Sequence, residues 1–224
     1  MCGRYTLTIT PEMLRTLINF AVTPNLEPRF NIAPTQMAPV VRADGDGGRK
    51  IDMLRWGLIP SWSKDMSVAS KLINARGETI AQKPSFRDAY QERRCLIPAD
   101  GFYEWRKEGD VKQPFRIGFR GGKPFLFAGL WESWTAPDGS DNAGETIETY
   151  TIVTTDANAK LSPIHHRMPC RFRSLAHRNA VGGGHCYPCL SRRRHGLLPC
   201  LDAGQQRAQR RCGMHCTVEE IGLI

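Results

Sequence analysis

The stretch GFYEWRKEGDVKQPFRIGFRGGKPFLFAGLWESW, residues 101–134, decides how this chain folds. It holds three runs rich in aromatic and aliphatic residues, at 101–107, 112–119 and 124–134, which the turn sequences EGD and RGGK separate. Short β-prone runs joined by glycine-containing turns are typical of antiparallel hairpins. We therefore predict a β-meander over this stretch.

The flanking sequence adds strands and a few helices. TIETYTIVTT (146–155) alternates β-branched residues and predicts a strand. QMAPVVRA (36–43) and KIDMLRWGL (50–58) predict a hairpin around the turn DGDGG, whereas SFRDAYQERR (85–94) and a segment that starts at Thr10-Pro11 predict helices. The expected fold class is α+β, with a mostly antiparallel, barrel-like β core and a few flanking helices.

Composition limits the classes of protein that fit the chain. The 224 residues are 41% hydrophobic and 24% charged, which is ordinary for a globular protein. The sequence has neither an apolar run long enough to cross a bilayer nor a secretory signal, so we expect a cytoplasmic protein, nucleoid-associated if bacterial. The net charge of +9 and the pI near 9.4 favour a polyanionic partner such as nucleic acid, although a generally solvated basic surface also explains them.

The composition changes at the sequence HHRMPC. Residues 170–224 contain nine arginines, no lysine, three acidic residues and six of the eight cysteines, and they show no helical or strand periodicity. We therefore divide the chain into a domain over residues 2–169 and an atypical basic, cysteine-rich tail over residues 170–224.

Three interpretations of the tail remain open. Out-of-frame translation of a GC-rich gene explains the abundance of Arg and Cys and the loss of periodicity, and we favour it. A disordered basic tail is the second interpretation. The third is a zinc module, because paired cysteines with adjacent histidines can form a tetrahedral site: Cys186, Cys189, Cys212, Cys216, His185 and His215.

Cys2 follows the initiator methionine directly. A small residue at this position usually permits removal of the methionine, which would leave an α-amine and a thiol on adjacent carbons. The α-amine titrates at ~7.7–8.0 and the thiol at ~8.5, so both groups are partly nucleophilic at neutral pH. No cysteine inside the chain has this pair of groups, although a cysteine here can also be incidental.

Three further motifs carry candidate chemistry. Strand alternation places Glu104 of GFYEW on one face with Phe102 and Arg106, where an apolar site would raise the carboxyl pKa and suit acid–base work. LINARGET contributes Asn74, and SPIHHRMP contributes His165. Each residue also has an ordinary structural explanation, because such residues serve as turn or cap amides, salt-bridge partners and surface histidines.

Taken together, eight segments resemble one family in their order along the chain. The sequence is similar to the SOS-response-associated peptidase (SRAP) family of abasic-site processing proteins over residues 2 to about 169. Domains of this family continue past the RMP sequence with more strand and helix, so the resemblance implies that the domain over residues 2–169 is incomplete at its C-terminal end. The resemblance rests on MCGRY, RFNIAPTQ, RWGLIPSW, LINARGET, RRCLIPADGFYEW, FAGLW, TIVTTDAN and IHHRMP.

The resemblance implies a protein that binds single-stranded DNA and traps abasic sites covalently. We expect a monomer, because nothing in the sequence suggests a higher oligomer, and we expect neither cofactor nor metal. Cys2 would form a thiazolidine ring with the abasic-site aldehyde, His165 would act as acid and base, and Glu104 would shuttle protons beside the amine. Asn74 would hold the Cys2 end or the sugar. The family name further implies autocatalytic removal of N-terminal extensions, and a Schiff base at the sugar implies a weak lyase activity.

The DNA contacts follow from the same motifs. Arg4, Arg76 and Arg167 are the expected phosphate contacts, because a guanidinium forms paired hydrogen bonds with phosphate. Trp62, in the loop LIPSWSKD, is expected to wedge against or stack on bases.

Two other functions compete with this interpretation. Class II glutamine amidotransferases also begin with MCG and use the cysteine as a nucleophile, but their glutamine-binding motifs are not found downstream. A non-enzymatic nucleic-acid-binding protein with a zinc-binding tail is the other alternative.

Overall fold

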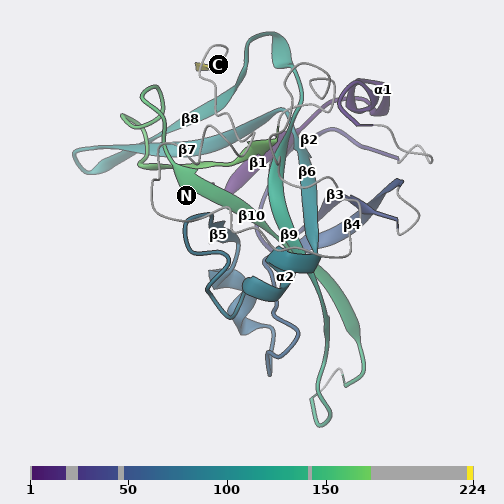
Figure 1. The fold of residues 1–224 in the computed structure, drawn as a ribbon. Helices are drawn as coiled ribbons and strands as arrows, with labels where there is room; N and C mark the ends of the chain where they lie inside the picture. Colours follow the sequence, from purple (N-terminus) through teal and green to yellow (C-terminus); the bar gives the residue numbers. More distant parts are fainter. Residues whose placement is uncertain (1, 19–24, 45–47, 141–142, 173–220, 224) are drawn as a thin grey trace, which may run out of the picture.

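The computed structural model describes residues 2–18, 25–44, 48–140, 143–172 and 221–223 (Figure 1). The strands in chain order are β1 (Arg4–Leu7), β2 (Arg29–Ile32), β3 (Met37–Ala43), β4 (Arg49–Trp56), β5 (Asn74–Arg76), β6 (Arg94–Ala99), β7 (Gly101–Glu108), β8 (Val111–Phe119), β9 (Phe125–Thr135), β10 (Thr146–Asp156), β11 (Arg167–Pro169), β12 (Arg171–Phe172) and β13 (Ile221–Leu223). The helices are α1 (Pro11–Arg15) and α2 (Arg87–Glu92), with 3₁₀ turns η1 (Ser67–Lys71) and η2 (Arg120–Gly122).

Five strands close into a barrel. The hydrogen-bonded order β10-β4-β3-β6-β9 returns to β10, because β9 and β10 pair over seven registered positions from Thr146↔Thr135 to Ile152↔Gly129. Closure leaves none of these five strands as an open edge. Among the strand pairs of the described residues most are antiparallel, and the pairs of β10 with β4 and with β5 are the parallel ones. The expected α+β, barrel-like fold is confirmed.

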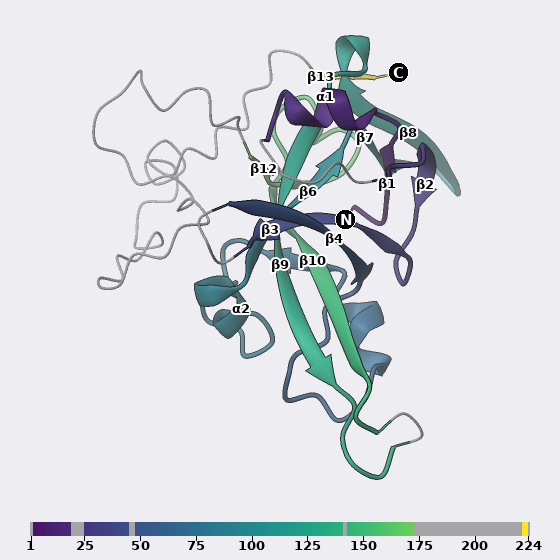
Figure 2. The same ribbon diagram turned by 90° about the vertical axis from the view of Figure 1, so that its right-hand side faces the viewer.

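A second sheet packs beside the barrel, with the order β13-β8-β7-β1-β2 (Figure 2). Its β7–β8 hairpin confirms the first half of the predicted meander. The second half of that prediction is wrong, because β9 leaves this sheet and pairs with β6 and β10 of the barrel. Gly121 and Gly122, with φ of 76° and 65°, redirect the chain between the sheets.

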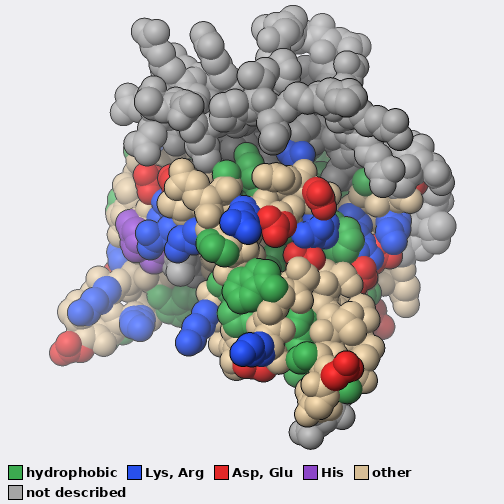
Figure 3. Space-filling model, turned by 60° about the horizontal axis from the view of Figure 1, so that its bottom comes forward, with side chains coloured by type: hydrophobic (Ala, Val, Ile, Leu, Met, Phe, Trp, Pro, Cys, Tyr) green, Lys and Arg blue, Asp and Glu red, His purple; other side chains and the backbone are tan. Residues whose placement is uncertain are grey.

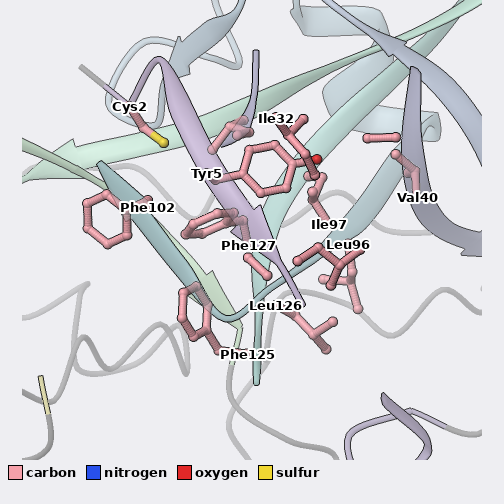
Figure 4. Close-up of a cluster of buried hydrophobic side chains, with 14 of the residues drawn as sticks. Cys2, Tyr5, Ile32, Val40, Leu96, Ile97, Phe102, Phe125, Leu126 and Phe127 are labelled. Carbon is pink, nitrogen blue, oxygen red and sulfur yellow. The ribbon is translucent and has the colours of Figure 1, made fainter. Parts of the chain in front are cut away.

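Aromatic side chains from both sheets fill the space between them (Figure 4). The Tyr5 ring of β1 lies 5.2 Å from Trp56 of β4 and 6.1 Å from Phe127 of β9, with edge-on geometry in both pairs. The hydroxyl groups of Tyr5 and Tyr150 are hydrogen-bonded at 2.8 Å. The first strand is therefore anchored in the core, directly after Cys2.

Both predicted helices are present and short. Thr10 caps α1 by accepting a hydrogen bond from the Met13 amide, and Pro11 occupies the first turn, as the sequence indicates. The helix ends at Arg15. Helix α2 packs against β6 and β9 of the barrel.

A buried guanidinium ties four barrel strands together. Arg42 of β3 donates two hydrogen bonds to Glu148 of β10 and one to Asp52 of β4, each at 2.6 Å. Its guanidinium carbon lies 4.3 Å above the centroid of the Trp131 ring of β9. The Arg42 side chain is only 6% exposed, whereas its acidic partners are 29% and 37% exposed.

Replacing Arg42 with Met is expected to lower the free energy of unfolding by about 1–3 kcal/mol. This is less than for a fully buried ion pair, because water still reaches the two carboxylates. Arg106→Met is the matched control, since Arg106 pairs with Glu108 at the surface and should contribute less than about 1 kcal/mol. Urea unfolding measures the free energy of unfolding of both variants. Equal losses of stability in the two variants would contradict a larger contribution from Arg42 than from a surface ion pair.

No helix within the described part of the chain is long and apolar enough to span a membrane. The cysteine and histidine pairs behind the zinc interpretation lie outside the described residues. Three cysteines lie within the described residues, Cys2, Cys95 and Cys170, and all three are buried.

Candidate active site beside the first strand

Cys2 lies immediately before β1 and is fully buried. Its thiol donates a weak hydrogen bond to the Arg4 carbonyl at 3.8 Å. The antiparallel register Arg4↔Tyr103 and Tyr5↔Phe102 runs the start of the chain alongside Glu104 of β7. Burial, reinforced by the negative charge of Glu104, raises the pKa of the Cys2 thiol well above its ordinary value. The thiol is therefore protonated at neutral pH.

Asn74 reaches Cys2 from the barrel. It begins β5, which pairs in parallel with β10 through Ile152↔Asn74. Its side-chain amide Nδ2 donates to the Cys2 carbonyl at 2.8 Å. The Asn74 Oδ1 atom is buried and has no hydrogen-bond partner among the described residues. An unsatisfied buried acceptor is costly, so this atom is available to a donor from a ligand.

Glu104 lies on the inner face of β7 and is 3% exposed, on the side that strand alternation predicts. Burial raises the pKa of its carboxyl, and the positive charge of His166 opposes this shift. The Arg106 guanidinium on the same strand pairs with Glu108. Glu104 is thus a buried carboxyl with an environment that suits proton transfer.

His165 lies in the loop before β11, with its ring stacked on His166 at 4.4 Å between centroids. The Arg167 N–H donates to His165 Nδ1 at 3.0 Å, which favours the neutral tautomer with its proton on Nε2. A protonated Nδ1 would instead donate to the Arg167 carbonyl, 3.2 Å away. Burial lowers the pKa of His165, which favours the neutral ring, the form that can accept a proton.

Direct contacts and charge interactions link these elements. Asn74 contacts Cys2, the Glu104 charge acts on the Cys2 thiol, and the His166 charge acts on Glu104. His165 is stacked on His166. Residues from four distant parts of the sequence therefore gather around the start of β1, which also brings the four predicted catalytic residues to one region.

Three of the four predicted DNA contacts are accessible. Arg76 is exposed, Trp62 is 59% exposed, and the half-buried Arg4 hydrogen-bonds to Asn31 at 3.3 Å. Figure 3 shows a face on which Lys and Arg side chains surround exposed hydrophobic ones, with histidine at one side. Arg167 differs, because its side chain is only 6% exposed and is engaged in ion pairs.

Sequence reasoning missed Glu78, the partner of Arg167. Its carboxylate accepts from both terminal nitrogens of Arg167, at 2.9 and 2.8 Å. The sole sequence signal is its place in LINARGET, four residues after Asn74. Nothing local in the sequence indicates a partner 89 positions away.

The described residues contain no group of three or more His, Cys, Asp or Glu side chains arranged to hold a metal ion. What the site offers is a thiol beside the chain's start, an amide, a buried carboxyl and a neutral imidazole. This set fits covalent chemistry on an electrophilic carbon, with proton transfer by neighbouring groups.

Comparison with known proteins identifies the family. The family model of the SOS response associated peptidase (SRAP) matches residues 1–179. The abasic site processing protein YoqW of Bacillus subtilis (strain 168) is 42% identical over 173 residues, which cover 75% of each chain. The abasic site processing protein HMCES of Gallus gallus is 36% identical over 171 residues, 63% of this chain and 50% of that protein. A crystal structure from Bordetella bronchiseptica superposes with a TM-score of 0.65 at 30% identity, covering 76% of this chain and 83% of that one. The chain therefore belongs to the SOS response associated peptidase (SRAP) family.

Proposed function

We propose that this chain processes abasic sites in single-stranded DNA by joining Cys2 covalently to the sugar aldehyde. The observation that carries the proposal is the hydrogen bond from Asn74 to the Cys2 carbonyl, which fixes Cys2 beside the buried Glu104. The relatives YoqW and HMCES are both named abasic site processing proteins. Their names support DNA with abasic sites as the substrate class.

The reaction begins once Met1 is removed, so that Cys2 carries the terminal amine. The amine adds to the aldehyde carbon of the open sugar, and loss of water gives an imine. The thiol sulfur then adds to the imine carbon, while its proton leaves sulfur and the nitrogen gains one. The product is a five-membered thiazolidine. Its ring closure is intramolecular, and the effective molarity of such a well-oriented reaction can reach about 10⁵ M.

The residues near Cys2 provide the proton transfers that this reaction needs. The Cys2 thiol is protonated because burial raises its pKa, so closure requires a base. Neutral His165 suits protonation and deprotonation of the sugar oxygen during ring opening and loss of water. Glu104, beside the thiol, suits transfer of the proton from sulfur to nitrogen.

Two minor reactions follow from the same chemistry, and we include them in the proposal. Hydrolysis of the bond before Cys2 by these residues would remove short N-terminal extensions. The imine intermediate also permits β-elimination at the sugar, which is a weak lyase activity.

The test is incubation with a single-stranded oligonucleotide that contains one abasic site, followed by heating in SDS. We expect a shifted band whose intensity depends on the abasic site, and an intact oligonucleotide should give none. Mass spectrometry of the band should show linkage at Cys2. A folded chain that forms no such band would refute the proposed function.

Trp62 is proposed to stack on bases near the abasic site. Its loop is anchored to β9, because the Trp134 indole Nε1 donates to the Ser63 carbonyl at 2.8 Å. Stacking on an aromatic side chain contributes about 1–3 kcal/mol per base, so Trp62→Ala should weaken binding of single strands by about 5- to 150-fold. Fluorescence anisotropy measures this, and Val111→Ala, an exposed hydrophobic residue on β8, serves as control. Unchanged affinity in Trp62→Ala would exclude the stacking role.

A further inference from the structure

The segments that carry Asn74 and His165 are far apart in sequence and meet on one strand, β10. Thr154 of β10 pairs with Arg76 of β5 on one side and with Pro169 of β11 on the other. A strand residue has one neighbour on each edge, so β5 and β11 flank opposite edges of β10. Backbone pairing alone leaves no direct link between these two flanking strands.

The Arg167 side chain bridges them across β10. From β11 it donates to the Thr154 carbonyl of β10 at 2.9 Å and to both carboxylate oxygens of Glu78, which follows β5. This two-pronged geometry is the strong and directional form of an arginine ion pair. The Arg167 side chain is 6% exposed and Glu78 is 32% exposed, so solvent screens the pair only in part.

Each end of this bridge is attached to a site residue. The Arg167 backbone N–H and carbonyl both lie within hydrogen-bond distance of His165 Nδ1, so a shift of Arg167 shifts the imidazole. Glu78 lies four residues after Asn74, in a segment whose Gly77 amide is hydrogen-bonded to Thr154. The ion pair thus joins the segment that carries the imidazole to the segment that carries Asn74.

We propose that Glu78 and Arg167 are positioning residues that hold His165 and Asn74 in register with each other. This rests on the proposed function, and it assigns Arg167 a role inside the protein in place of the phosphate contact that the sequence predicts. Neither residue touches the reacting atoms, and both act through the backbone of the two segments.

The test compares Glu78→Gln with Asp156→Asn. Asp156 accepts from the same guanidinium at 2.5 Å but is 79% exposed and lies on β10 itself, so its loss leaves the bridge intact. A misplacement of about 1 Å can cost on the order of 10²-fold in rate, so we expect the maximal crosslinking rate of Glu78→Gln to fall by about 10- to 100-fold at saturating abasic-site DNA. The DNA concentration for half-maximal rate should stay unchanged, and Asp156→Asn should retain both values.

Other outcomes would overturn the proposal. An unchanged maximal rate in Glu78→Gln, or an equal loss in Asp156→Asn, contradicts positioning through the bridge. A raised half-saturating concentration with a weaker salt dependence in Arg167→Lys would instead identify a phosphate contact. Melting temperatures of all variants distinguish loss of folding from loss of position.

A second measurement decides the inference without DNA. Nitrogen chemical shifts of His165 at about pH 8 report which ring nitrogen carries the proton. We expect the Nε2-protonated form in the native chain and in Asp156→Asn, and a mixture of both forms in Glu78→Gln. Retention of the single form in Glu78→Gln would refute the positioning role. If the native chain forms no crosslink, the proposed function fails while this measurement still tests the bridge.

Discussion

Replacing Cys2 with Ser is expected to lower the yield of heat- and SDS-stable crosslink by at least about 100-fold. The variant keeps the terminal amine, so the imine still forms, but it lacks the thiol that closes the stable ring. The imine alone is hydrolysed when the protein is denatured. The measurement is the fraction of abasic oligonucleotide shifted after heating in SDS, with the native chain beside it.

Borohydride provides the matched control for this variant. Reduction converts the imine to a stable amine, so Cys2→Ser should give a shifted band when borohydride is present during the reaction. Recovery of the band would show that the amine still reaches the aldehyde and that only ring closure is lost. A stable crosslink from Cys2→Ser without reductant would refute the thiazolidine mechanism.

Sequence patterns correctly predicted the hairpins and the helix cap whose formation depends on residues close together in the sequence. The β7–β8 hairpin, the β3–β4 hairpin and the cap at Thr10 each depend on residues close together in sequence, and each is confirmed. The pairing of β9 was not predictable in this way. Phe125–Leu130 are all buried, which fits a strand covered on both faces but does not name its partners.

In the candidate active site, too, local motifs could be predicted and a long-range contact could not. Cys2, Asn74, Glu104 and His165 lie in recognisable motifs, and the structure gathers them at the start of β1. The sequence predicts that Arg167 is a phosphate contact, because a guanidinium suits phosphate. The sequence does not indicate whether that guanidinium is buried or exposed. Its burial follows from pairing with Glu78, and such a long-range ion pair leaves no periodic signal.

Glu104→Gln should affect activity and stability in different ways. Proton transfer from the thiol needs the ionised carboxylate, whereas the buried position favours the protonated carboxyl in the folded chain. General acid–base assistance contributes about 10²–10⁴-fold, so we expect the maximal crosslinking rate to fall by about 10²-fold or more. Glu132→Gln is the matched control: Glu132 is also a buried carboxyl whose pKa burial raises, but it lies on β9 and pairs with Arg93. Its replacement should leave the crosslinking rate unchanged, and an equal loss in both variants would contradict a specific role for Glu104.

The stability of Glu104→Gln should change with pH in a fixed direction. In the unfolded chain the carboxyl titrates at about 4.3, and burial raises its pKa in the folded chain. Its contribution to stability is therefore complete below the unfolded pKa and is lost as the pH rises through the folded pKa. Gln mimics the protonated form at every pH, so its melting temperature should match that of the native chain near pH 4 and exceed it near pH 8. A native chain that is more stable than the variant near pH 8 would show that the ionised carboxylate stabilises the site, and would contradict a carboxyl whose pKa burial raises.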